Sequence, residues 1–311
     1  MNTKVKGYAL GAIAAATYGM NPLFALPLYA DGMSTDSVLF FRYLFAIPIL
    51  AIMLKVRGRD FKVSKKEVSM LFGMGLLLSM SSLTLFLSYS YMDAGIASTI
   101  LFVYPIIVAM LMTVFFKEKL TIQTVVCIML ALTGIGLLYQ TSDGATLNFT
   151  GVMFVFGSAL SYALYIVGVN RQPLAGMATL KVTFYVLLFG LSIYVVRLGM
   201  AGQMELPTKW YYWGNLLALA IFPTCISFLC TTSAIQYIGS TPTAILGALE
   251  PVTAIFFGIT VFGEVLTPRE AVGVVLIIAA VSFVVAGGKV AQLWNRVKKM
   301  FPRLPFKKKR N

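Results

Sequence analysis

The sequence predicts an all-α membrane protein with ten transmembrane helices in two inverted five-helix repeats and with both termini in the cytoplasm. Composition, the placement of basic residues and a similarity between the two halves of the chain support this prediction. Of the 311 residues, 59% are hydrophobic and only 12% are charged, whereas a soluble domain carries about 25% charged residues. Ten helices of roughly 20 residues each would leave about 100 residues for loops and ends.

Ten apolar runs, bounded by charged or turn-forming residues, are long enough to cross a bilayer. These runs are Gly7–Ala30, Asp36–Val56, Glu67–Tyr91, Ala94–Phe116, Thr121–Tyr139, Asn148–Asn170, Ala178–Met200, Trp210–Ile235, Thr241–Phe262 and Pro268–Gly287. Lys4 and Lys6 precede the first run, which has no small-residue cleavage site. We therefore expect a retained first helix rather than a removed signal peptide.

Basic residues fix the expected orientation, because lysine and arginine near helix ends stay on the cytoplasmic side. A cytoplasmic N-terminus places the basic loop 55–66 and the basic tail 289–311 on that side. The opposite side then receives only Arg197, Lys209 and Arg269. The tail could bind anionic lipid headgroups or act only as a topology signal.

The two halves of the chain resemble each other when the sequence is aligned with itself at a shift of 146 residues. The stretch 91–121 then aligns with 237–267 without a gap. Because five spans is an odd number, the second half must cross the membrane in the opposite direction to the first. Such inverted repeats are typical of secondary transporters, in which two related halves expose a central site alternately to each side. The predicted domains are a first repeat over 1–145, a second repeat over 146–288 and the tail. The aligned residues are Tyr91, Pro105, Phe116, Glu118, Leu120 and Thr121 with Tyr237, Pro251, Phe262, Glu264, Leu266 and Thr267.

Short motifs recur in the two repeats. The first repeat has Phe-Lys-Glu-Lys-Leu-Thr at 116–121, and the second has Leu-Glu-Pro at 249–251 and Phe-Gly-Glu-Val-Leu-Thr at 262–267. With these motifs, essentially the whole chain resembles the EamA family of the drug/metabolite transporter superfamily. The resemblance implies a ten-helix inverted-repeat carrier in the inner membrane, usually an exporter of amino acids or other small metabolites.

Several chemistries are excluded by the composition. The chain has no histidine, which removes histidine metal sites, Ser/His/Asp catalysis and imidazole proton relays. Its three cysteines lie inside apolar runs, where a thiol usually packs as a small hydrophobe. No phosphate-binding glycine loop is present. We expect no enzyme activity, no cofactor, no metal and no nucleic-acid partner, and a monomer could already form a complete transport unit.

Glu250 is an acidic side chain in the middle of a predicted span. A charge there costs roughly 2.5 to 3.5 kcal/mol on insertion scales, so we expect a reason for it. Glu250 could bind a proton, pair with a cationic group of a substrate, or serve as a structural carboxyl that bonds neighbouring helices.

Two prolines lie at matching places in the repeats. Pro251 follows Glu250, and Pro105 follows Tyr104. Each removes a backbone donor and is expected to free the carbonyl four residues earlier, on Gly247 and Leu101. Paired interruptions of this kind indicate either a central binding site or kinks needed for packing.

Other polar side chains on the spans are candidates for substrate contact or for hydrogen bonds between helices. Pro22 marks a further helix break beside one of them. Arg42 could neutralise a substrate carboxylate or Glu250, or could extend to the interface. Glu118 is expected to have an architectural role at a helix end. The remaining candidates are Asn21, Tyr104, Tyr162, Asn215 and Gln236.

The sequence therefore predicts a secondary-active carrier of small organic metabolites that works by alternating access, coupled to protons or to exchange. Multidrug efflux is an alternative, because 16 methionines and many aromatic residues suit an adaptable apolar pocket. An intramembrane enzyme that acts on lipid is disfavoured, because it would need a nucleophile and an acid/base pair in the membrane.

Overall fold

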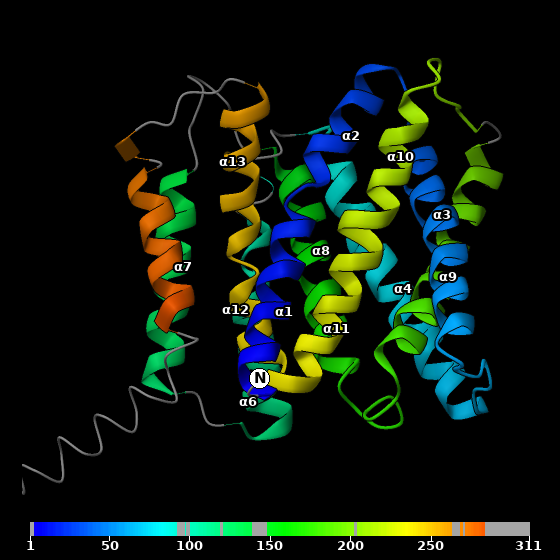
Figure 1. Cartoon of the computed structure of the whole chain (residues 1–311). Helices are drawn as coiled ribbons and strands as arrows, with labels where there is room; N and C mark the ends of the chain where they lie inside the picture. The colour runs from blue at the N-terminus through cyan, green and yellow to red at the C-terminus, as the bar shows by residue number, and fades with distance from the viewer. Residues whose placement is uncertain are drawn as a thin grey trace, which may run out of the picture.

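A computed structural model of the chain shows a bundle of packed helices (Figure 1). Every regular element among the residues that the structure describes is a helix. Glu264, Thr267 and the predicted tail lie outside these residues. The described residues are 3–91, 97, 100–118, 121–138, 148–201, 204–262, 268–269 and 271–283.

The helices follow the order of the predicted spans. In the first repeat they are α1 (Thr3–Tyr18), α2 (Asn21–Ala30), α3 (Thr35–Val56), α4 (Lys65–Ser88), α6 (Tyr104–Phe116) and α7 (Ile122–Leu138). In the second they are α8 (Phe149–Gly168), α9 (Thr179–Ala201), α10 (Tyr212–Ala220), the π-helix η1 (Ile221–Ile226), α11 (Ser227–Ile238), α12 (Ser240–Leu246) and α13 (Leu249–Phe262).

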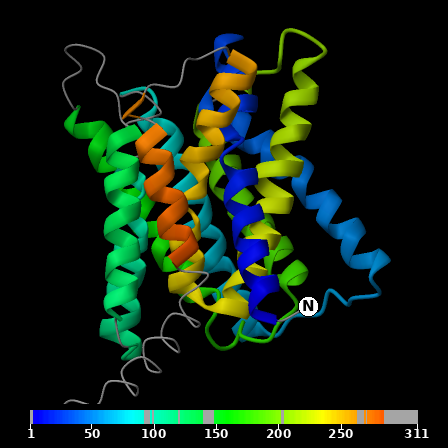
Figure 2. The same ribbon diagram turned by 60° about the vertical axis from the view of Figure 1, so that its left-hand side comes forward.

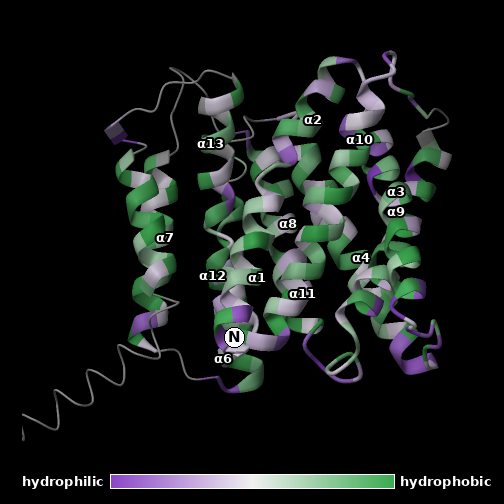
Figure 3. Ribbon diagram, viewed as in Figure 1, coloured by the Kyte–Doolittle hydropathy of each residue, from purple (hydrophilic) through white to green (hydrophobic). Residues whose placement is uncertain are grey.

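Six helical segments are long and apolar enough to cross a membrane, and they agree with six of the ten predicted spans. They are Thr3–Ala30, Thr35–Val56, Lys65–Ser88, Phe149–Gly168, Thr179–Met200 and Tyr212–Ile238. Shorter apolar helices cover Tyr104–Phe116, Ile122–Leu137 and Ala271–Phe283. Apolar residues cover the helices, and hydrophilic residues gather at their ends and in the loops (Figure 3). The count of ten spans stays a prediction.

Side-chain caps explain where several helices begin. The Ser64 hydroxyl accepts a hydrogen bond from the backbone of Glu67, whose carboxylate accepts one from the Ser64 backbone, so a capping box starts α4. Asn148 caps α8 through its side-chain oxygen. The Thr121 hydroxyl accepts a hydrogen bond from the Thr124 backbone at 3.1 Å, so Thr121 caps the start of α7.

The two repeats are packed into each other rather than side by side. Helix α1 of the first repeat packs along α11 of the second, and α4 packs against both α8 and α9. Hydrogen bonds join the repeats, including one of 3.0 Å between the hydroxyls of Ser81 and Ser158. Helix α7 lies beside the helix Ala271–Phe283 at one side of the bundle in both views (Figure 2). There the Gln123 amide donates to the Phe283 carbonyl at 2.6 Å.

Polar contacts join α9 to α3 at one end and to the loop after α3 at the other. At the end of the bundle where the chain begins, the Lys181 ammonium contacts the Asp60 carboxylate at 2.7 Å. This hydrogen bond lowers the pKa of Asp60. At the opposite end, the Arg197 guanidinium donates to both carboxylate oxygens of Asp36 at 2.6 and 3.0 Å. These contacts and the packing between them make α3 and α9 a single unit.

Four predicted spans are interrupted among the described residues. The span Ala94–Phe116 breaks at Phe102 and Val103, directly before Tyr104 and Pro105 start α6. The span Gly7–Ala30 breaks at Gly19 and Met20 between α1 and α2, where Pro22 starts the new helix. The span Thr241–Phe262 breaks at Gly247 and Ala248 between α12 and α13. In Trp210–Ile235, η1 separates α10 from α11; it contains a proline, which cannot supply a backbone donor.

Candidate functional site

A narrow cavity with room for about one water molecule lies among α1, α6, α8, α11, α12 and α13. One side consists of the small residues Gly11, Ala14 and Ala15 of α1. Their small side chains allow helices of the two repeats to pack closely around the cavity. The polar residues that line the cavity are Tyr104, Tyr162, Ser227, Thr231, Thr243 and Glu250.

Glu250 lies at the start of α13, immediately after the helix break. Its side chain is half-buried and lines the cavity. Among the described residues it has neither an ion pair nor a hydrogen bond to its carboxylate. A carboxyl within a helical bundle in the membrane needs a partner. At Glu250 that partner can be a proton, or the cationic group of a solute that enters the cavity.

The breaks of the two repeats meet beside Glu250. Gly19, at the end of α1, fits against the Glu250 backbone, and a Cβ atom at Gly19 would lie 2.9 Å from the Cβ atom of Thr253. Only glycine allows this approach. The first helix break therefore contacts the start of α13 directly.

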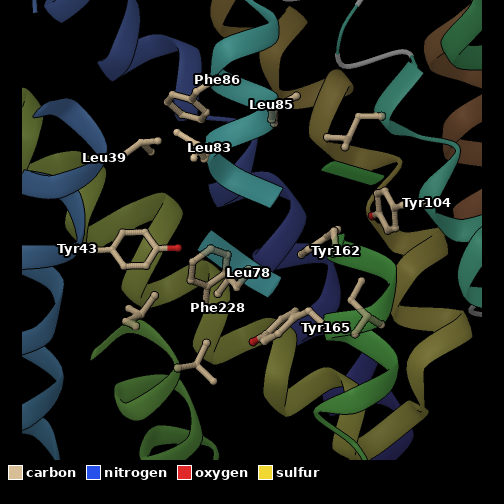
Figure 4. Close-up of a cluster of buried hydrophobic side chains, with 14 of the residues drawn as sticks. Leu39, Tyr43, Leu78, Leu83, Leu85, Phe86, Tyr104, Tyr162, Tyr165 and Phe228 are labelled. Atoms are coloured by element: carbon tan, nitrogen blue, oxygen red, sulfur yellow. The ribbon is translucent and has the colours of Figure 1, made fainter. Parts of the chain in front are cut away.

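Tyrosine rings surround this junction. The Tyr104 hydroxyl donates a hydrogen bond to the Ala244 carbonyl at 3.0 Å, and the Tyr104 and Tyr162 rings meet edge-to-face with centroids 4.9 Å apart. Figure 4 shows these two rings close together on different helices. Tyr18 stacks on Tyr162 at 6.5 Å. The structure thus places Tyr104 and Tyr162 together with Glu250 around one cavity.

The hydrogen bonding of one backbone carbonyl at the helix break differs from the expectation. The Gly247 carbonyl, expected to be freed by Pro251, accepts a hydrogen bond from the Glu250 backbone at 2.9 Å. The tight turn at the break brings this closer donor into place. The carbonyl that receives side-chain help is that of Ala244, which accepts from Tyr104.

Arg42 is fully buried and does not extend to the interface. Its Nε atom donates to the Thr224 hydroxyl at 2.6 Å, and one terminal nitrogen donates to the Pro223 carbonyl at 3.0 Å. The guanidinium carbon lies 5.9 Å from the ring centroids of Tyr18, Phe86 and Phe228. No ion pair joins Arg42 to Glu250 in the described part of the chain. Arg42 therefore holds η1 in place and lies outside the cavity lining.

The other candidates are dispersed. Asn21 is buried at the start of α2, beside Pro22, and its side-chain oxygen has no partner among the described residues. Gln236 is exposed and donates to the Met177 carbonyl at 2.9 Å, so it joins α11 to a loop away from the cavity. Asn215 is half-buried on α10 and is not among the residues that line the cavity.

Sequence reasoning missed four residues in or beside the site: Tyr18, Ser227, Thr231 and Thr243. The repeat offered one signal, because Tyr18 aligns with Tyr162 at a shift of 144 residues, slightly different from the shift of 146 that aligns the later spans. The hydroxyl residues carried no such signal, because serine and threonine are common along membrane helices as local backbone partners.

Comparison with known proteins identifies the family. The family model described as the EamA-like transporter family matches residues 5–140 and again residues 149–286. The chain belongs to this family. The two matches cover the two predicted repeats, and the structure is that of a multi-pass helical transporter.

Known relatives agree with this assignment. An uncharacterized transporter of Archaeoglobus fulgidus is 26% identical over 88% of this chain and 94% of its own length. An uncharacterized transporter of Bacillus subtilis is 22% identical over 85% of this chain and 86% of its own. A protein crystal structure with 16% identity matches 89% of this chain and 96% of its own with a TM-score of 0.75, which shows a shared fold.

Proposed function

We propose that the protein is a secondary-active exporter of small organic metabolites, amino acids or related compounds, in the inner membrane. The observation that carries this proposal is the Glu250 carboxylate, which lines a cavity at the junction of helix breaks without a protein partner among the described residues.

Alternating access supplies the mechanism. Discontinuous helices at a repeat interface bind solutes in many carriers, and rocking of the repeats opens the site to each side in turn. The cavity lies between α1 of the first repeat and α11 to α13 of the second. Glu250 would couple the rocking of the repeats to a proton. The change between the conformations that open to the two sides costs less free energy when a buried carboxyl is protonated and neutral.

The test compares cells that express the wild type, Glu250→Gln or an empty vector, with mass spectrometry of medium and cytosol. We expect a class of amino compounds to accumulate in the medium only with the wild type. The Glu250→Gln protein should reach the membrane in normal amounts, because glutamine keeps the size of the side chain, yet export should fall by about tenfold or more.

Glu118→Gln is the matched control, because Glu118 is an exposed carboxyl in the loop after α6. Export with this variant should equal that of the wild type. Unchanged export by Glu250→Gln would contradict the coupling role of Glu250. A broad drug-resistance phenotype without metabolite export would favour multidrug efflux, to which the tyrosine rings of the cavity are also suited.

A further inference from the structure

We infer that the cavity selects the protonated amino group of an organic amine and disfavours solutes that carry a carboxylate. The inference rests on the proposed transport function and narrows its substrate class from amino acids and related compounds to the related amines, which lack the carboxylate. It depends on the balance of hydrogen-bond donors and acceptors around the cavity, not on the Glu250 charge alone.

Three of the five hydroxyl groups that line the cavity already donate to the backbone, and the other two, of Tyr162 and Thr231, bond to each other. Ser227 donates to the Ala14 carbonyl at 3.0 Å, Thr243 donates to the Gly239 carbonyl at 2.7 Å, and Tyr104 donates to the Ala244 carbonyl. A hydroxyl has one proton and two lone pairs. These three groups can therefore offer only lone pairs to a solute.

The Glu250 carboxylate adds further acceptor positions at the same place, and a carboxylate has no proton to donate. With three hydroxyl protons used by the backbone and one by the Tyr162–Thr231 pair, the described lining offers more acceptor positions than donors. A protonated primary amine has three N–H donors and no acceptor, so it complements this lining. Aromatic faces also attract cations, and Tyr104 and Tyr162 supply such faces beside Glu250.

A carboxylate has no matching partner in the cavity. Among the residues that line it there is no lysine or arginine. Arg42 is bonded to Thr224 and Pro223 and lies against the ring of Tyr18, which in turn stacks on Tyr162. Arg42 is thus not among the described residues that line the cavity. An anionic group next to Glu250 would meet like charge and lone pairs.

The experiment measures binding to the purified full-length protein in lipid nanodiscs. Radiolabelled phenethylamine and butylamine are the probes, and each competes with its matched amino acid and its matched acid: phenylalanine and 3-phenylpropionate for the first, norvaline and valerate for the second. We expect at least one amine to bind, with the amino acid and the acid weaker by about tenfold or more, which corresponds to ~1.4 kcal/mol.

Glu250→Gln should weaken binding of that amine by about tenfold or more, because the neutral amide also brings N–H donors to the site. Glu118→Gln should bind as the wild type does. The inference is overturned if an amino acid or acid binds as tightly as its amine, if neither amine binds to folded wild-type protein, or if Glu250→Gln keeps full affinity.

Failure of this inference differs from failure of the proposed function. Amine-selective binding without counterflow in proteoliposomes would retain the selectivity and remove the transport role. Counterflow of an amino acid or acid, with no preference for the amine, would retain transport and remove the selectivity.

Discussion

Arg42 illustrates how one buried side chain joins the two repeats. Pro223 has no backbone N–H, so the hydrogen bond that would reach the Leu219 carbonyl in a regular helix is missing. The Thr224 hydroxyl donates to that carbonyl at 2.7 Å and accepts from Arg42. Arg42 of α3 therefore completes a chain of hydrogen bonds that stabilises η1 of the second repeat.

Replacing Arg42 by lysine should destabilise the protein by about 2 kcal/mol, within the range for hydrogen bonds to charged groups. Lysine keeps the charge but lacks the planar fork that contacts Thr224 and Pro223 together. Unfolding in mixed micelles with increasing SDS measures the change. Thr224→Val should cost a similar amount, and the double variant should lose less than the sum of the two. Strict additivity would show that the two residues do not act as a unit.

Helix breaks are the elements that shape the site, and the sequence indicated only some of them. Pro22 and Pro251 pointed to the breaks after α1 and α12, because proline interrupts helical hydrogen bonds. The π-helix at Pro223 was not predicted, because its geometry depends on Arg42, which is 181 positions away in the sequence. Residues paired across the bundle carry no local periodic signal, which is why Tyr18 and the cavity hydroxyls were also missed.

The break between α12 and α13 should not tolerate a larger residue. A Cβ atom at Gly247 would overlap the Tyr104 hydroxyl, so Gly247→Ala should destabilise the protein by about 1–3 kcal/mol. Adding Tyr104→Phe removes the overlapping oxygen and should recover part of the loss. SDS titration measures both variants. Gly157→Ala, on α8 where a Cβ atom would meet no neighbour, should be neutral or stabilising. Equal stability of the Gly247 and Gly157 variants would refute this packing.

For the whole molecule, the sequence predicted the helical membrane class and the two repeats, and the family match over both repeats agrees with them. Composition and internal similarity are sufficient for that much, because they are summed over many residues. The interlocking of the repeats was not predictable. Whether α1 packs along α11 depends on residues such as Gly7, where an added Cβ atom would overlap Ile238 of α11.

A disulfide across the cavity should lock the transporter in the conformation described. An ideal Cβ atom at Gly11 would lie 3.6 Å from the Cβ atom of Leu246, within the range of about 3.5–4.5 Å found in disulfides. We expect Gly11→Cys with Leu246→Cys, in a background without Cys127, Cys225 and Cys230, to cross-link on oxidation. Counterflow in proteoliposomes should then fall by about tenfold or more and return after reduction. Each single cysteine variant should be insensitive to oxidant. Helices α1 and α12 come from different repeats and border the cavity. If the fully cross-linked protein transports as fast as the same protein after reduction of the disulfide, the repeats do not separate there.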